Sequence, residues 1–192
     1  MNKYLRQFLM KKATLSEQEL QEVMAHILVN SYKKGTVLLK QGDISEKCFF
    51  VLKGCVRQYS VGDDGRETTY NFFIEGQSIV LFKSYKLKEP SDYFLSCSED
   101  STLIVGSPDS EESMYDQFPE VKNITRHIME LNFGQAQEDA AMLMGGTPEE
   151  RYLRLMEKRP GLMKRVPQHQ LASYLGITPE SLSRIKKRTT PH

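Results

Sequence analysis

The stretch VPQHQLASYLGITPESLSRI, residues 166–185, determines how the C-terminal part of the chain folds. Pro167 suits a helix start, because the first helical residues need no N–H donor there, and the small side chain of Ala172 allows a second helix to cross closely. Gly176 supplies the positive φ of a tight turn, and Thr178 suits the cap of the helix that follows. Apolar residues fall at 171, 175, 177, 182 and 185, where the two helices would pack together. This spacing predicts a helix-turn-helix.

The second helix of this motif would turn a polar face outward. Glu180 and Arg184 lie one helical turn apart on it, so they could form an ordinary surface ion pair. Within a helix-turn-helix, however, an arginine can donate two hydrogen bonds to guanine and a glutamate can accept one from the cytosine amino group. We therefore predict that this face contacts bases and that neighbouring polar side chains contact phosphates. The predicted DNA-binding residues are Glu180, Ser181, Ser183, Arg184, Lys187 and Arg188 on the second helix and His169 and Ser173 on the first, with Arg165 and Lys186 as further candidates for phosphate contacts.

Charge is distributed unevenly along the 192 residues. Residues 146–192 carry a formal net charge of +6, whereas residues 1–118 carry −3 and residues 119–145 carry −2. A basic segment on a slightly acidic body favours a polyanionic partner for that segment, although a solvated basic face would have the same composition.

Short apolar runs separated by glycine-containing turns fill residues 32–105. The runs at 56–59 and 68–71 flank the glycine-rich turn at 62–65 and predict a β-hairpin. Several short strands at regular spacing predict a jelly-roll β-roll. Residues 2–28 have a helical pattern instead, in which Ser16 and Glu19 form a capping box.

Residues 119–144 are predicted to form one helix about 39 Å long. Its apolar positions recur at spacings of three, four or seven, as along the seam of a coiled coil, and we expect this seam to join two subunits in part. The alternative is that the helix packs only onto its own β-domain. The seam residues are Val121, Ile124, Ile128, Leu131, Gln135 and Met142. Because Gly145-Gly146 ends the helix, we expect an α+β protein with a β-roll sensor domain and N-terminal helices at 1–118, a dimerisation helix at 119–145 and a DNA-binding domain at 146–192.

Composition disfavours several other classes of protein. No run approaches the roughly 20 apolar residues of a membrane helix, and the first residues lack the apolar core of a signal peptide, so we expect a cytoplasmic protein with no membrane partner. Cys48, Cys55 and Cys97 form no CxxC pair, and the four histidines are scattered, which disfavours disulfides and metal sites. No histidine lies within residues 32–105, whereas a cupin-type enzyme needs clustered His and Glu ligands. We expect no metal, no cofactor and no enzymatic activity.

The order of these parts resembles that of the Crp/Fnr family of bacterial regulators, and most of all its short members found in Bacteroidetes-type bacteria. The resemblance spans nearly the whole chain. It is carried by the helix-turn-helix, by KGTVLLKQGD at 34–43, by FFVLKGCV at 49–56, and by the shorter matches DGRE at 64–67 and EERYL at 149–153. The resemblance implies a cyclic-nucleotide-binding-type β-roll, a dimerisation helix and binding to an inverted repeat in duplex DNA, with RNA polymerase as a possible partner.

The chain departs from the cyclic-AMP-binding members of that family. Those members have a Glu shortly after the glycine that matches Gly76, and an Arg-Ser pair in a phosphate-cradling loop. Here Leu81 matches the Glu and Asp92 falls near the Arg, and an Asp would repel the cyclic phosphate. The first cysteine, Cys48, also leaves no N-terminal cluster for the iron–sulfur branch. Cyclic AMP is therefore not expected; the candidate ligand-binding residues for another effector are Leu81, Asp92, Tyr93, Arg126 and Asn132.

The C-terminal end also differs. Fuller members continue after the second helix with a winged β-hairpin, whereas this sequence stops at His192, so we expect a reduced or absent wing. Pro179 stands where cyclic-AMP-responsive members have a base-contacting Arg, but Glu180 and Arg184 match positions that contact bases in the family. The predicted function is sequence-specific transcription regulation. The alternatives are a small-molecule-binding jelly roll and a protein-interaction module without DNA binding.

Overall fold

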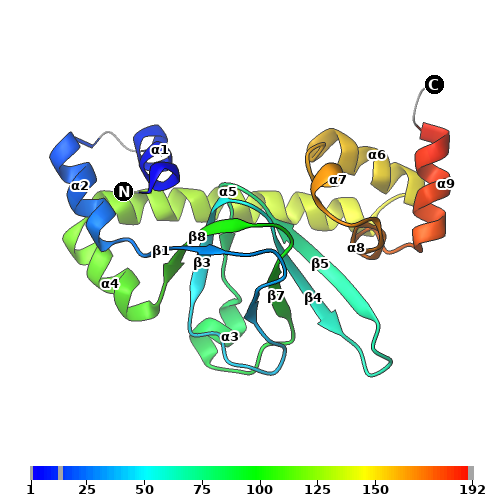
Figure 1. Ribbon diagram of the computed structural model, residues 1–192, viewed down its shortest axis with the longest axis horizontal. Helices are drawn as coiled ribbons and strands as arrows, with labels where there is room; N and C mark the ends of the chain where they lie inside the picture. The colour runs from blue at the N-terminus through cyan, green and yellow to red at the C-terminus, as the bar shows by residue number, and fades with distance from the viewer. Residues whose placement is uncertain (1, 13–14, 190–192) are drawn as a thin grey trace.

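The computed structural model describes residues 2–12 and 15–189 (Figure 1). A β-roll occupies the middle of the molecule, and the long helix α5 (Pro119–Met144) runs across one side of it. Three further helices lie at one end of α5, namely α1 (Lys3–Lys12), α2 (Glu17–His26) and α4 (Pro108–Gln117). Four lie at the other end, namely α6 (Pro148–Lys158), α7 (Leu162–Arg165), α8 (Gln168–Tyr174) and α9 (Pro179–Thr189).

Two four-stranded antiparallel sheets form the β-roll, in the orders β1-β8-β3-β6 and β2-β7-β4-β5. Their strands are β1 (Val29–Tyr32), β2 (Val37–Leu39), β3 (Cys48–Lys53), β4 (Val56–Val61), β5 (Glu67–Phe73), β6 (Ser78–Ile79), β7 (Phe94–Cys97) and β8 (Ser101–Gly106). The short helix α3 (Phe82–Leu87) lies between β6 and β7. Strands β4 and β5 pair from Val56–Phe73 to Val61–Glu67, which confirms the predicted hairpin.

Side chains of the central strand β3 alternate between two apolar cores. Phe49 and Val51 join the core of the β-roll, together with Leu95 and Leu103. Phe50 belongs instead to a second core, which the outer face of this sheet forms with the helices at the α1 end. Because a strand turns successive side chains to opposite faces, one strand serves both cores.

The helix predictions that rest on local signals are confirmed. Helix α5 spans the predicted range, and Ser16 begins α2 with the predicted capping box, in which its hydroxyl accepts from the Glu19 N–H and the Glu19 carboxylate accepts from the Ser16 N–H. The residues of the predicted seam differ in burial. Val121, Ile128 and Met142 are buried within their own chain, as the alternative interpretation required, whereas Leu131 is 53% exposed.

Helices α3, α4 and α7 were not expected from the sequence. Helix α4 begins with Ser107 as its cap but buries none of its residues, and α3 has only six residues, so neither produces a clear apolar period. Among the residues that the structure describes, no strand follows β8, so no wing hairpin lies there. Nor is any helix of the described ranges long and apolar enough to cross a membrane.

Candidate DNA-binding interface

The helix-turn-helix is built on a closed apolar core. Ala172 and Leu182 are wholly buried where α8 and α9 cross, and Leu171, Leu175 and Ile185 are at most 3% exposed. An alanine at 172 allows the close approach of the two helices, as its size predicted. The apolar side of each helix is therefore used in packing, which leaves its polar side to solvent.

The turn between the helices has the predicted local structure. Gly176 has a φ of +66°, and the Ile177 N–H donates to the Ala172 carbonyl at 3.0 Å. Thr178 caps α9, because its hydroxyl accepts from the Ser181 N–H at 3.2 Å. Ile177 packs against the apolar core, as expected for the residue that closes the turn.

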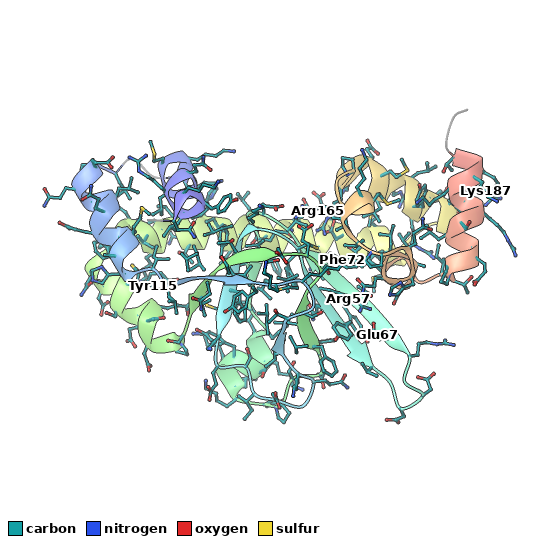
Figure 2. All side chains as sticks on the ribbon, viewed as in Figure 1. Arg57, Glu67, Phe72, Tyr115, Arg165 and Lys187 are labelled. Carbon is teal, nitrogen blue, oxygen red and sulfur yellow. The ribbon has the colours of Figure 1, made fainter. Side chains whose placement is uncertain are left out.

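The outer face of α9 carries the predicted DNA-binding side chains. Glu180, Ser183, Arg184, Lys187 and Arg188 are exposed, and Ser181 is half-buried. Lys187 lies on α9 at the edge of the molecule, away from the β-roll (Figure 2). Arg188 forms an exposed ion pair of 3.0 Å with Glu149, a contact of the kind that solvent and salt weaken.

Glu180 is held in its ionised form at the start of α9. Its own backbone N–H and the Thr178 hydroxyl lower the pKa of the Glu180 carboxyl, and the positive charge of Arg184 lowers it further. Glu180 and Arg184 nevertheless form no ion pair within 4 Å, so the surface-pair alternative is not realised in this structure. A carboxylate can only accept hydrogen bonds, which suits an amino group of a base.

The two candidates on α8 are placed differently. His169 is exposed near the start of the helix. The Ser173 hydroxyl instead accepts from the Thr69 N–H at 2.9 Å and donates to the Glu67 carbonyl at 3.1 Å, both on β5. The structure therefore places Ser173 in a contact with the β-roll, and its hydroxyl proton is donated to Glu67 rather than left for a phosphate.

The five candidate ligand-binding residues are not brought together. The Asn132 side chain accepts from the Ser78 N–H at 2.7 Å and thereby holds α5 to β6. Leu81 packs against the β-roll core, and the Tyr93 ring meets that of Tyr70 with centroids 4.9 Å apart. Asp92 is exposed. Arg126 is also exposed and lies 4.0 Å from Glu130.

A cavity of about 510 Å³ lies elsewhere, between the outer face of β3 and β8 and the helices α2, α3, α4 and α5. None of the five candidate ligand-binding residues lines it. Its wall is mostly apolar and includes Phe50, Phe82, Ile104, Met114, Ile124 and Ile128. At one end, the Glu111 carboxylate accepts from the Cys48 thiol and the Tyr85 hydroxyl.

The three cysteines are buried free thiols. Burial raises the pKa of Cys48 and of Cys55 to about 12, so neither is a thiolate at neutral pH. Burial also raises the pKa of Cys97. In the described part of the chain, no three His, Cys, Asp or Glu side chains are grouped to hold a metal ion.

Comparison with known proteins gives one consistent result. Residues 29–117 match the cyclic nucleotide-binding domain. The chain is 25% identical over 166 residues to the nitrogen fixation regulation protein FixK of Rhizobium meliloti (strain 1021), covering 82% of this chain and 73% of FixK. It is 24% identical over 191 residues to the fumarate and nitrate reduction regulatory protein of Yersinia pestis, covering 91% of this chain and 74% of that protein. These relatives are regulators, not enzymes.

Solved structures share the fold. The c-di-GMP responsive global regulator CLP of Xanthomonas campestris aligns with a TM-score of 0.67 at 17% identity, over 90% of this chain and 91% of CLP. FixK2 of Bradyrhizobium japonicum aligns with a TM-score of 0.65 at 20% identity, over 84% of this chain and 83% of FixK2. The domain match and these relatives support a transcription regulator of the Crp/Fnr family, and the solved structures share its fold.

Proposed function

We propose that this regulator acts as a homodimer that binds an inverted repeat in duplex DNA by inserting α9 of each subunit into the major groove. The observation that carries the proposal is the outer face of α9. It combines an acceptor, Glu180, with the donors Arg184 and Lys187, on a helix whose opposite side is fully used in packing. A helix that lies in the major groove needs one polar side and one packed side, because only one side of the helix contacts base edges and phosphates.

The charges of the segment support the same function. Residues 146–192 carry a net charge of +6, and Lys187 makes no ion pair with any residue that the structure describes. Among the described residues, Arg188 pairs with Glu149, whose side chain is 41% exposed, so a phosphate can replace that partner at little cost. Release of counterions from phosphates then contributes affinity without sequence preference.

The surface of α5 supports a dimer. Leu131 is 53% exposed and lies on the apolar seam that the sequence predicts for subunit contact. A second α5 packed along this seam would cover it, whereas Phe133, two residues further on, faces nearly the opposite side of the helix. Two subunits joined in this way would present their α9 helices to half-sites about 34 Å apart, one turn of DNA.

The direct test is selection of binding sites from random duplex DNA with the purified protein and no added ligand. We expect enrichment of an inverted repeat, and light scattering should give the mass of a dimer. Failure to enrich any sequence, with the protein folded and dimeric, would contradict ligand-independent DNA binding by this regulator.

An apolar effector is favoured over cyclic AMP by the cavity under α5. Its wall contains no arginine, its basic side chains are His26, Lys47 and Lys86, and most of its surface is aliphatic or aromatic. A cyclic phosphate buried there would lack the bidentate partner that arginine provides. Thermal shift measurements should therefore show no stabilisation by cyclic AMP, whereas a ligand from an apolar panel should raise the melting temperature.

RNA polymerase as a partner and a cytoplasmic location remain predictions.

A further inference from the structure

One contact between the C-terminal helices and the β-roll is made by a half-buried arginine. Arg165, the last residue of α7, donates two hydrogen bonds to the Glu75 carboxylate, at 2.8 and 2.9 Å. It also donates to the Glu99 carboxylate and, at 2.7 Å, to the Gly54 carbonyl. Figure 2 shows Arg165 between the β-roll and the C-terminal helices. We call Arg165, Glu75 and Glu99 the Arg165 cluster.

The cluster engages every nitrogen of the Arg165 guanidinium. Each of the three side-chain nitrogens of Arg165 donates to at least one carboxylate, and its side chain is only 24% exposed. The Glu75 carboxylate raises the pKa of Arg165. Burial of Glu75 opposes ionisation, but hydrogen bonds from Arg165 and the Gly54 N–H outweigh it and lower the pKa of Glu75.

A phosphate would not displace these partners readily. One guanidinium faces two carboxylates, so the cluster is net negative, and an approaching phosphate would meet repulsion. Arg165 was a candidate for a phosphate contact from its sequence position alone. The structure gives it a different task, because its N–H groups are directed into the β-roll.

Two more contacts hold the same surfaces together. Phe72 of β5 is wholly buried in the core of the helix-turn-helix, with its ring 5.5 Å from that of Tyr174. Arg159, which follows α6, forms a buried ion pair with Asp139 of α5 and donates to the Phe72 carbonyl at 3.0 Å. Ser173 adds its hydrogen bonds to β5. These contacts fix the orientation of α8 and α9 relative to α5 and the β-roll.

We propose that Arg165 is a positioning residue. Through Glu75 and Glu99 it sets the direction of α9 relative to the β-roll, and so sets which spacing between half-sites a dimer accepts. The proposal rests on the proposed function, since spacing has meaning only for a dimer on an inverted repeat. Arg165 itself touches no DNA in this scheme.

The physical reason is the position of α9 relative to the contact. Helix α9 lies on the side of the C-terminal helices that faces away from the β-roll, so a rotation of these helices at the β-roll contact moves α9 further than α8 (Figure 1). Half-sites are spaced in units of base pairs, and each added pair both shifts and rotates the second groove. A dimer with rigidly held helices rejects a changed spacing, whereas a dimer with loosely held helices tolerates it.

The test varies the number of base pairs between the two half-sites of the operator. Operators derived from the selected site would carry one base pair more or fewer between half-sites, and their affinities would be measured for the wild type and for the variant with both Glu75→Gln and Glu99→Gln. Glutamine keeps an acceptor oxygen for the Gly54 N–H, so the fold should survive. We expect the preference of the variant for the original spacing to fall by about tenfold, with non-specific affinity unchanged. Glu46→Gln is the matched control, because Glu46 is exposed on the β-roll and outside the cluster.

A second pair of variants separates positioning from phosphate contact. Arg165→Lys keeps the charge but loses the planar fork, so it should lose spacing preference much as the double glutamine variant does. Arg165→Gln should leave the salt dependence of non-specific binding unchanged, whereas Lys187→Gln should reduce its log–log slope by about 1. Thermal melts would confirm that each variant is folded.

The outcomes are distinguishable. If the wild type binds no DNA, the proposed function fails, whatever the cluster does. If the wild type prefers one spacing and the double glutamine variant keeps that preference in full, the positioning role of Arg165 is wrong. A reduced salt slope for Arg165→Gln would also overturn it, because Arg165 would then contact phosphate.

Discussion

Gly54 and Gly176 both have positive φ values, but their surroundings differ. At Gly176, with φ +66°, a Cβ would meet no atom within 4 Å, so the cost of Gly176→Ala is the backbone strain alone, about 1–2 kcal/mol. At Gly54, with φ +108°, a Cβ would lie 2.6 Å from the Ser101 Cα. Gly54→Ala must therefore move the β-roll backbone as well, and should destabilise the protein more. Urea unfolding monitored by circular dichroism would rank the two variants, and equal costs would contradict this account.

Arg184 is the residue with the clearest role in specificity. Arg184→Ala should relax the preference at one base pair in each half-site and cost about 1–3 kcal/mol in operator affinity. Fluorescence anisotropy with operators substituted at each position would show which base pair loses its preference. Arg126→Ala is the control, because Arg126 is also exposed but lies on α5, outside the helix-turn-helix. An Arg184→Ala variant that binds the selected site as tightly as the wild type would remove Arg184 from the interface.

The role of a residue could be predicted where it depends on near neighbours in the sequence, and could not where it depends on a distant contact. The Thr178 cap and the Gly176 turn depend on neighbours within four residues, so sequence spacing was enough to find them. Ser173 and Arg165 have their partners on the β-roll, 66 to 111 residues away in the chain. The spacing of residues along one sequence does not show which polar residue on a helix surface will contact a residue so distant in the chain.

At the scale of elements, α5 shows why an apolar period does not identify its partner. The period correctly predicted a helix of 26 residues, but the same period includes side chains that pack against two different cores and one that is exposed. Val121 contacts the core at the α1 end, Met142 joins the core of the helix-turn-helix, and Leu131 is exposed. A helix that spans a whole molecule packs against different elements along its length. The apolar period does not show at which residue one packing partner gives way to the next.

The ion pair between α5 and the segment after α6 gives a prediction at this scale. Asp139 and Arg159 have side chains only 8% and 6% exposed, so removing one charge leaves the other buried without its partner. Asp139→Asn should lower the free energy of unfolding by about 3–5 kcal/mol, because an uncompensated buried charge is costly. Chemical denaturation would measure the loss. Glu138→Gln, the neighbouring change at an exposed ion pair with Lys158, should cost less than about 1 kcal/mol. Similar losses for the two variants would mean that Asp139 contributes no more than a surface charge.

For the whole molecule, the contact between the C-terminal helices and the β-roll should depend on pH. The folded state lowers the pKa of Glu75 below its ordinary value of 4.5, so Glu75 contributes stability above pH 4.5 and loses that contribution as the pH falls through the lowered pKa. Arg165 keeps its charge throughout this range, and Glu99 faces the same guanidinium, so protonation of Glu75 weakens the cluster without removing it.

Hydrogen exchange of the α7 and α8 amides should therefore accelerate, relative to that of the β-roll core, as the pH falls below about 4.5, once the intrinsic pH dependence of exchange is corrected for. In Glu75→Gln the same amides should exchange faster at neutral pH and change less across this window, because no carboxyl remains at position 75 to titrate. Identical pH profiles in the two proteins would show that the cluster does not control how firmly the helix-turn-helix is held, and that Phe72 and the Arg159–Asp139 pair hold it without help from Arg165.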